Sequence, residues 1–223
     1  DEYNDRAEKV SEYLHYINMS ASVPQNTTGL SEEAERTVLD LAKYNAGAEW
    51  QAVIDNYISA VQSCDANALM NTLQLEFVEL LPVIVGRELE MELENEKVLS
   101  SYTDFYQEEL TALREELAAR YGDEYSIRFE AYAVEHASST DINLMNDFLF
   151  GKYDSEIAIE DEVIIKGQFW VTGTSDDVSG QEGDGFLYHD LVMIKSGGQW
   201  KLGISEGFPK MSQDRLREIF GIE

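Results

Sequence analysis

The chain has 223 residues, of which 44 are acidic and 16 basic, so its formal net charge at neutral pH is −28. This charge repels nucleic-acid phosphates and anionic lipid headgroups, and we therefore expect no nucleic-acid partner and no purely electrostatic membrane binding. A content of 43% hydrophobic and 11% aromatic residues is typical of a folded globule and excludes a disordered chain.

The first half of the chain predicts helices. Residues 7–17 and 30–44 carry apolar side chains at helical spacing on either side of a polar loop, with Ser31 as the N-cap of the second helix. We expect residues 1–48 to form a helical extension of the domain that follows, residues 49–223.

That domain opens with a strongly amphipathic helix from Glu49, and Asp65 caps a second helical piece that ends near Pro82. The acidic stretch 87–96 alternates like a strand, but its helical flanks favour a helix. Residues 97–121 predict the longest helix, which Gly122 terminates.

After Gly122 the pattern changes to strands. Residues 125–137 alternate, a short helix starts at Asp141, and residues 157–174 form a long strand in which Gly167 marks a bulge or bend. Two further strands follow, joined by a tight turn of one serine and two glycines at 196–198. A terminal helix begins after Ser212. The order predicts an α+β fold with helices packed on one face of a curved, mostly antiparallel sheet.

Five stretches carry a family resemblance through their order, namely AVIDNYISAVQSCDANAL, LLP, ARYGDEYSIRFEAYAV, VIIKGQFWVTG and VMIKSGGQWKLG. Together they span residues 49–205 and resemble the nuclear transport factor 2-like (cystatin-like α+β cone) superfamily. More narrowly, they resemble extracytoplasmic lipoproteins of unknown function from Gram-positive bacteria. The resemblance implies a sheet curled into a cone whose mouth can hold a ligand. Members of this superfamily range from isomerases and dehydratases to non-catalytic binding modules, so the fold does not choose between these functions.

The best candidate for catalysis is the Tyr-His-Asp stretch that begins at Tyr188. Strand alternation places Tyr188 and Asp190 on one face, which also carries Phe186, Val192 and Ile194. A carboxylate desolvated on an apolar face has a raised pKa, which suits a general base acting beside a carbonyl, with Tyr188 as hydrogen-bond donor. A structural role for Asp190, at a bend of the chain or paired with a nearby hydrogen-bond donor, is favoured over the catalytic role.

Two other groups of residues are candidates for binding. Tyr57 and Trp170, together with Tyr188 and Asp190, could line an apolar pocket, although such aromatic residues also suit an ordinary core. The acidic loop 173–185 offers oxygen ligands to a hard cation through Asp176, Asp177 and Asp184. Its spacing does not fit the twelve-residue calcium loop, so a flexible hairpin tip is favoured over a metal site.

No nucleophile or phosphate-binding motif is present in the sequence, and we expect no cofactor. The single cysteine, Cys64, excludes an intrachain disulfide. No apolar run approaches the roughly 20 residues needed to cross a bilayer. Because the chain begins at Asp1 rather than Met, a removed secretory or lipid-anchor leader is compatible with the sequence.

The sequence therefore favours a non-catalytic binding or interaction module in an extracytoplasmic bacterial location, at the cell surface or secreted. Its expected partner is a small apolar ligand or a cell-surface protein, and the membrane is reached only through a removed lipid-anchor leader. The alternative is an isomerase or dehydratase-type enzyme that uses Asp190 and Tyr188.

Overall fold

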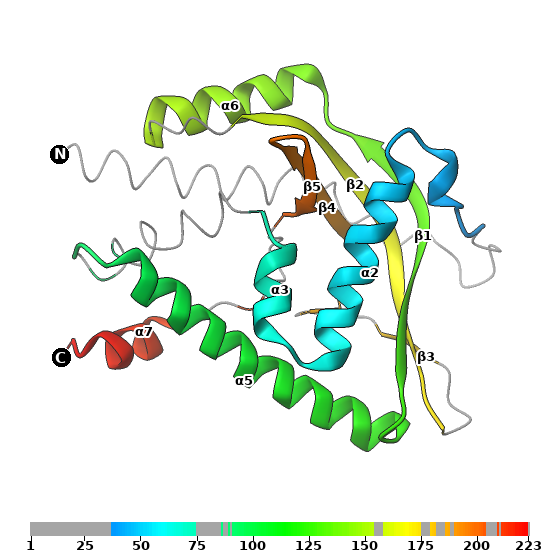
Figure 1. Ribbon diagram of the computed structural model, residues 1–223, viewed down its shortest axis with the longest axis horizontal. Coiled ribbons are helices and arrows are strands. Elements are labelled where there is room, and N and C mark those ends of the chain that lie inside the picture. The colour runs from blue at the N-terminus through cyan, green and yellow to red at the C-terminus, as the bar shows by residue number, and fades with distance from the viewer. Residues whose placement is uncertain are drawn as a thin grey trace, which may run out of the picture.

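The computed structural model describes residues 37–74, 86, 89, 91–153, 158–174, 179–181, 186–187, 190–203, 209 and 211–222. This part of the chain is an α+β structure in which helices pack on an antiparallel sheet, as predicted (Figure 1). The predicted helix 7–17 and the cap at Ser31 lie outside the described residues. The division at residue 48 stays a prediction.

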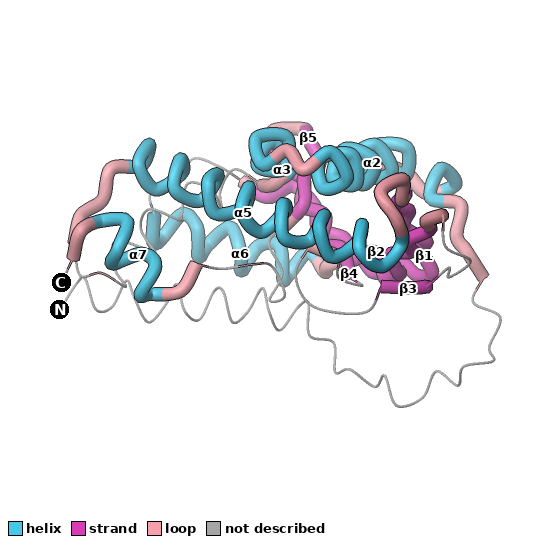
Figure 2. Tube along the Cα trace, turned by 90° about the horizontal axis from the view of Figure 1, so that it is seen from below, coloured by secondary structure: helices cyan, strands magenta, loops and turns pink. Residues whose placement is uncertain are grey.

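The elements in chain order are η2 (Leu41–Lys43), α2 (Gly47–Ser63), α3 (Ala66–Thr72), α5 (Asn95–Tyr121), β1 (Ser126–His136), α6 (Ser139–Tyr153), β2 (Ile159–Thr172), β3 (Ser179–Gln181), β4 (Asp190–Ser196), β5 (Gln199–Leu202) and α7 (Gln213–Phe220). None of these helices combines the length and apolar composition that a membrane-spanning segment requires. In Figure 2, α2 and α3 lie together on one side of the strands, and α5 runs alongside them.

The helix ends follow their predicted caps. The Asp65 carboxylate accepts the backbone N–H of Ala68 (3.0 Å) and starts α3, and Ser212 caps α7 through the N–H of Arg215 (3.2 Å). Gly122 ends α5 at a positive φ of 91°. These short polar and glycine residues supply the groups or the backbone conformation that a helix end needs.

Several helix boundaries differ from the prediction, among them the start of α6, which is Ser139 instead of Asp141. Residues 37–40 are extended instead of helical, because the Leu39 N–H bonds to β1 and the Asp40 carboxylate caps the short helix η2. α3 ends at Thr72, well before Pro82. Residues 91–94 are irregular, since the Met91 N–H closes a turn onto the carbonyl of Gly86 and α5 begins only at Asn95.

The sheet has the strand order β1-β2-β4-β5, with every neighbouring pair antiparallel, and β3 pairs with β2. β2 pairs with β1 along one edge, and with β4 and β3 in succession along the other. The described strands form an open sheet. Two glycines at positive φ, Gly197 and Gly198, make the predicted turn between β4 and β5.

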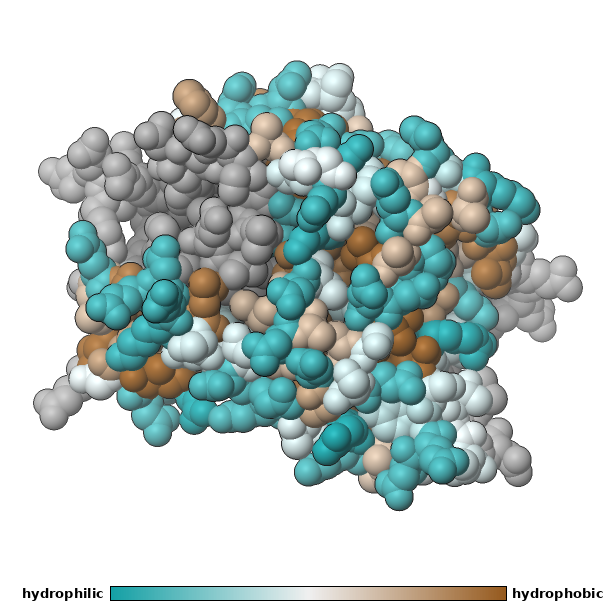
Figure 3. All heavy atoms as spheres, viewed as in Figure 1, coloured by the Kyte–Doolittle hydropathy of each residue, from teal (hydrophilic) through white to brown (hydrophobic). Residues whose placement is uncertain are grey.

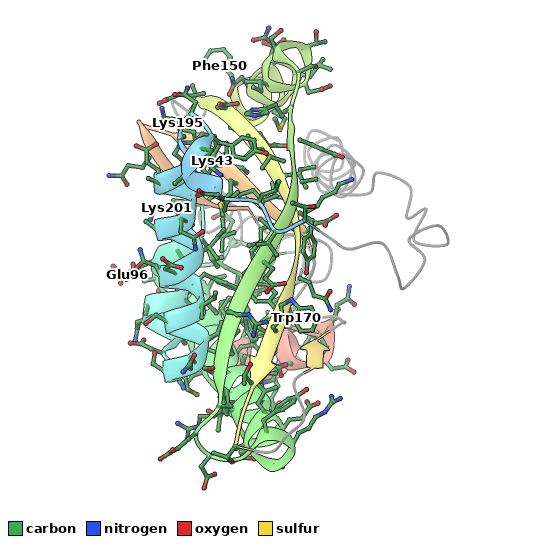
Figure 4. All side chains as sticks on the ribbon, turned by 90° about the vertical axis from the view of Figure 1, so that its right-hand side faces the viewer. Lys43, Glu96, Phe150, Trp170, Lys195 and Lys201 are labelled. Atoms are coloured by element: carbon green, nitrogen blue, oxygen red, sulfur yellow. The ribbon has the colours of Figure 1, made fainter. Side chains whose placement is uncertain are left out.

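The side chains of the long strand β2 alternate between the two faces of the sheet, as the sequence predicts. The side chains of Val163, Ile165, Phe169 and Val171 are fully buried in the core beneath the helices. The ring of Trp170 lies on the opposite side of the sheet from α2 (Figure 4).

The predicted irregularity near Gly167 is also present, but the extra residue sits in the facing strand. The register of β1 against β2 shifts between Ala131 and Ala133, so Tyr132 is the bulged residue. Gly167 lies opposite Ala131, where an added Cβ would be 2.2 Å from the Phe129 ring. The glycine is therefore required by close packing.

Candidate functional site

A cavity of about 570 Å³ lies between helix α2 and strand β1, and we call it the α2–β1 groove. Its volume lies within the roughly 300–1,000 Å³ of small-ligand sites. Its walls are formed by Gln51, Asp55, Ile58, Ser59, Gln62 and Ser63 of α2 and by Ile127, Arg128 and Phe129 of β1. Hydrophilic side chains dominate the surface over α2, with small hydrophobic areas between them (Figure 3).

The amide side chain of Gln62 fixes one end of the groove. Its Nε2 donates to the carbonyl of Tyr125 (3.2 Å), and its Oε1 accepts the backbone N–H of Ile127 (3.1 Å). A side chain of α2 therefore occupies the position of a neighbouring strand at the start of β1. The N–H of Ile127 points toward α2 and away from β2.

Strand alternation extends this orientation along β1. In an antiparallel pair, successive residues direct their backbone groups alternately toward and away from the partner strand. Arg128 and Glu130, opposite Trp170 and Gln168, therefore bond to β2, whereas Phe129 directs its N–H and C=O to the free edge.

The other end of the free edge is occupied by the segment before η2. The N–H of Leu39 donates to the carbonyl of Ala131 (2.8 Å). Ala131 is two residues after Phe129, so the backbone groups of both residues point to the same edge of β1. Between these two ends, the carbonyl of Ile127 and both backbone groups of Phe129 have no hydrogen-bond partner in the described part of the chain. The groove thus contains a short, unpaired strand edge.

The groove is lined by one acidic residue, Asp55, and one basic residue, Arg128, whose guanidinium is paired with Glu130. The Asp55 carboxylate accepts only from Gln51 Nε2 (2.8 Å), and no cation of the described chain pairs with it. A second hollow of about 460 Å³ shares Gln62 with the groove and is also lined by Arg114, Glu115 and Asp123, among others. We expect the carboxylates of the groove and of this hollow, which are Asp55, Glu115 and Asp123, to attract cations.

On the far side of β1, Arg128 belongs to a separate network. It forms an ion pair with Glu130 (3.3 Å), and its guanidinium lies 5.5 Å from the centroid of the Trp170 ring. The Trp170 Nε1 donates to the Tyr132 hydroxyl (3.4 Å), which in turn donates to Glu130 (3.0 Å). This network holds Arg128 and Trp170 against the sheet.

The structure does not bring the predicted pocket residues together. Tyr57 is fully buried in the core under α2, where its hydroxyl donates to the carbonyl of Phe186. Trp170 and Asp190 lie on the opposite face, and Asp190 is in register with Lys166 of β2. Whether any of them contacts a ligand stays a prediction.

The predicted grouping of Phe186 with Asp190 is wrong. Phe186 packs against Tyr106 of α5, with ring centroids 5.9 Å apart, on the helix-covered side of the sheet. Residues 186–187 form a bend before β4 begins at Asp190, so strand alternation does not extend back to them. Val192 and Ile194 share the face of Asp190, as predicted.

The remaining predicted residues, Tyr188, Asp176, Asp177 and Asp184, lie outside the described residues. Within the described ranges, no three His, Cys, Asp or Glu side chains are placed so that they could hold a metal ion.

One buried carboxyl was missed by the sequence interpretation. Glu162 of β2 is only 3% exposed, and no described residue forms a hydrogen bond or ion pair with its side chain. Burial, together with the charges of Asp141 on α6 and the adjacent Asp161, raises the pKa of Glu162 to about 7. The signal was present, because Glu162 shares the strand alternation of the apolar Ile164.

Comparison of the chain with family models, with curated proteins and with solved structures finds no match. The resemblance of residues 49–205 to the cone superfamily therefore depends on motif order alone. The function has to be inferred from the geometry of the chain itself.

Proposed function

We propose that the protein is a non-catalytic binding module whose ligand lies in the α2–β1 groove. The observation that carries this proposal is the edge at Phe129, whose backbone groups have no partner in the described part of the chain and face a cavity with an apolar floor. Ile58, Ile127 and Phe129 supply that floor, and serine and glutamine side chains of α2 supply hydrogen-bonding groups. Such a combination of apolar surface and a few polar groups is typical of binding sites.

The proposal includes an extracytoplasmic bacterial location and a cone-type curvature of the sheet. Both are supported by the resemblance of residues 49–205 to extracytoplasmic lipoproteins, and the α+β order of the elements agrees with it. The ligand is a small apolar compound or a segment of a cell-surface protein.

A second candidate function is an enzyme that uses a pocket carboxylate. Glu162 favours it, since a buried carboxyl with a pKa of about 7 suits a general base at neutral pH. Glu162 lines neither the α2–β1 groove nor the hollow beside it. The binding module is therefore preferred.

The proposal is tested by backbone amide NMR of the whole chain during titration with mixed small apolar compounds and short peptides. We expect shifts concentrated at Ile58, Gln62, Ile127 and Phe129. Ser59→Trp places an indole in the groove and should abolish these shifts without loss of the fold. Shifts that cluster around Glu162 or Asp190, with conversion of a compound, would instead support the enzyme.

A further inference from the structure

We infer that the α2–β1 groove binds an extended peptide segment rich in lysine or arginine, which pairs with the free edge of β1 as an additional strand. This inference rests on the proposed binding function and specifies its ligand class. Three properties of the groove support it, namely backbone groups without a partner in the described part of the chain, the defined ends of the edge and the charge.

The backbone groups at the edge have the arrangement that an added strand needs. The N–H and C=O of Phe129 point the same way, so one residue of an antiparallel peptide can exchange both hydrogen bonds with Phe129. A peptide residue two positions away reaches the carbonyl of Ile127. Extended peptides commonly bind proteins by such addition to an exposed sheet edge.

The two ends of the edge limit the segment that can pair. Gln62 already holds the N–H of Ile127, and Leu39 already donates to Ala131. The Leu39 contact also shows that this edge accepts the backbone of an extended chain. The free positions therefore suit a short segment, whose side chains point alternately to the two faces of the sheet.

The two faces of the sheet differ beside this edge, so we expect different peptide side chains on each face. Peptide residues opposite Ile127 and Phe129 point toward Ile58 of α2 and should be apolar. Residues opposite Glu130 point to the other face, where a carboxylate shared with Arg128 is half-buried. An alternation of apolar and cationic residues fits both faces.

Charge decides between the possible occupants. Asp55 has no cationic partner in the described chain, whereas Arg128, which also lines the groove, is already paired with Glu130. The neighbouring hollow adds Glu115 and Asp123 against Arg114. The net charge of −28 repels an acidic peptide, and it equally repels a second copy of this chain that would pair edge to edge. A cationic segment of another molecule is therefore the occupant that the surface favours.

The test uses the whole chain and a blocked eight-residue peptide that alternates valine with lysine. Two comparison peptides replace lysine with glutamate, or carry N-methyl groups on alternate residues, which removes backbone donors from one edge. The affinity of each is measured by amide NMR titration for the wild type, Asp55→Lys, Ser59→Trp and a control, Glu109→Lys. Glu109 is exposed on α5 and lines neither cavity, so the control changes the net charge equally.

We expect the lysine peptide to shift the amides of residues 127–131, and the glutamate and N-methylated peptides to leave them unchanged. Asp55→Lys should weaken binding by roughly three- to tenfold, and Glu109→Lys by less than about twofold, because only Asp55 lies in the groove. Ser59→Trp should abolish binding.

Equal binding of the N-methylated peptide would overturn the strand pairing, and equal binding of the glutamate peptide would overturn the charge preference. Binding that survives Ser59→Trp would place the peptide elsewhere and overturn the inference as well. If the lysine peptide fails while a small compound shifts the groove amides, this inference falls and the proposed function stands. If nothing shifts them, both fall.

Discussion

The β1–β2 ribbon has two ends that differ in how completely they are covered. At the α6 end, β2 pairs with β1 on one edge and with β4 on the other, and α6 packs against it. At the groove end, no described residue pairs with the edge of β1 at Phe129, beside α2, and three residues of β3 replace β4 on the far edge of β2. We call the first the closed end, because both edges of β2 are paired there and α6 packs against it, and the second the open end, because no described residue pairs with Phe129 of β1.

The opposite edge of the sheet is covered at one point. The short strand β5 is covered where the chain leaves α3, because the N–H of Gln74 donates to the carbonyl of Leu202 (2.8 Å). Exposed edges promote association, and proteins usually cover or charge them. An edge left free beside a cavity is therefore a place to look for a partner, whereas the closed end contributes stability.

The largest effect is expected at the closed end, from Glu162→Gln. The pKa of Glu162 in the folded protein, about 7, lies above its ordinary value of 4.5, so folding takes up a proton between these values. Wild-type stability should fall as pH rises through this window, by up to about 3 kcal/mol at the upper end. The glutamine variant should lack this decline, which denaturant unfolding at a series of pH values would measure.

If the stability of Glu162→Gln falls with pH as steeply as that of the wild type, the buried carboxyl is not the source of the pH dependence. Peptide binding in the groove should be the same in both proteins at a fixed pH. A change in affinity would mean that the two ends of the ribbon are coupled.

Between the two ends, Gly167→Ala should destabilise the ribbon by about 2 kcal/mol, since a Cβ there meets the Phe129 ring and the backbone carbonyl of Glu130. Thermal unfolding measures the loss. Gly151→Ala is the matched control, because nothing lies within 4 Å of its Cβ position. Equal stability of the two variants would contradict the close packing of β1 against β2.

Tyr57→Phe distinguishes a core role from a ligand role. Removal of the hydroxyl leaves the buried carbonyl of Phe186 without this donor and should cost about 1–2 kcal/mol. Groove affinity, measured by the same titration as above, should stay unchanged. A loss of affinity at unchanged stability would instead support the sequence-based assignment of Tyr57 to a binding pocket.

A smaller effect is expected at the open end, from Gln62→Ala. The variant loses the two hydrogen bonds to Tyr125 and Ile127, but Gln62 is exposed and water can replace them, so we expect a loss of about 1 kcal/mol. Amide hydrogen exchange at Ile127 should accelerate, while exchange at Gln74 on the covered edge should not. Similar acceleration at both amides would indicate global destabilisation and remove the contrast between the edges.

The sequence predicted those parts of the fold that depend on local pattern. Alternation placed Val163 and Ile165 on one face of β2 and Ile164 on the other, and the glycines at 197 and 198 located the last hairpin. The predicted positions of helix ends were wrong where tertiary contacts determine them. An example is Leu39, whose N–H bonds to a strand more than ninety residues away.

The groove could not be predicted, because it depends on strand order and helix placement. The sequence of residues 126–131 does not indicate that β1 is an edge strand. It also does not indicate that Gln62, from a helix distant in the sequence, bonds to the start of this strand. The position of Glu162 on a largely apolar face could have been predicted, because the alternation that made Asp190 a candidate also applies to Glu162. The pattern gave no measure of how deeply each carboxyl is buried.

We propose that the edge at Phe129, which no described residue pairs with, binds a peptide backbone. Residue-resolved amide hydrogen exchange tests it most directly, by comparing Phe129 with Arg128 and Glu130, which bond to β2. We expect the Phe129 amide to exchange much faster than both of these amides in the free protein and to become protected when the valine–lysine peptide is added. Protection of Phe129 equal to that of its neighbours in the free protein would contradict it.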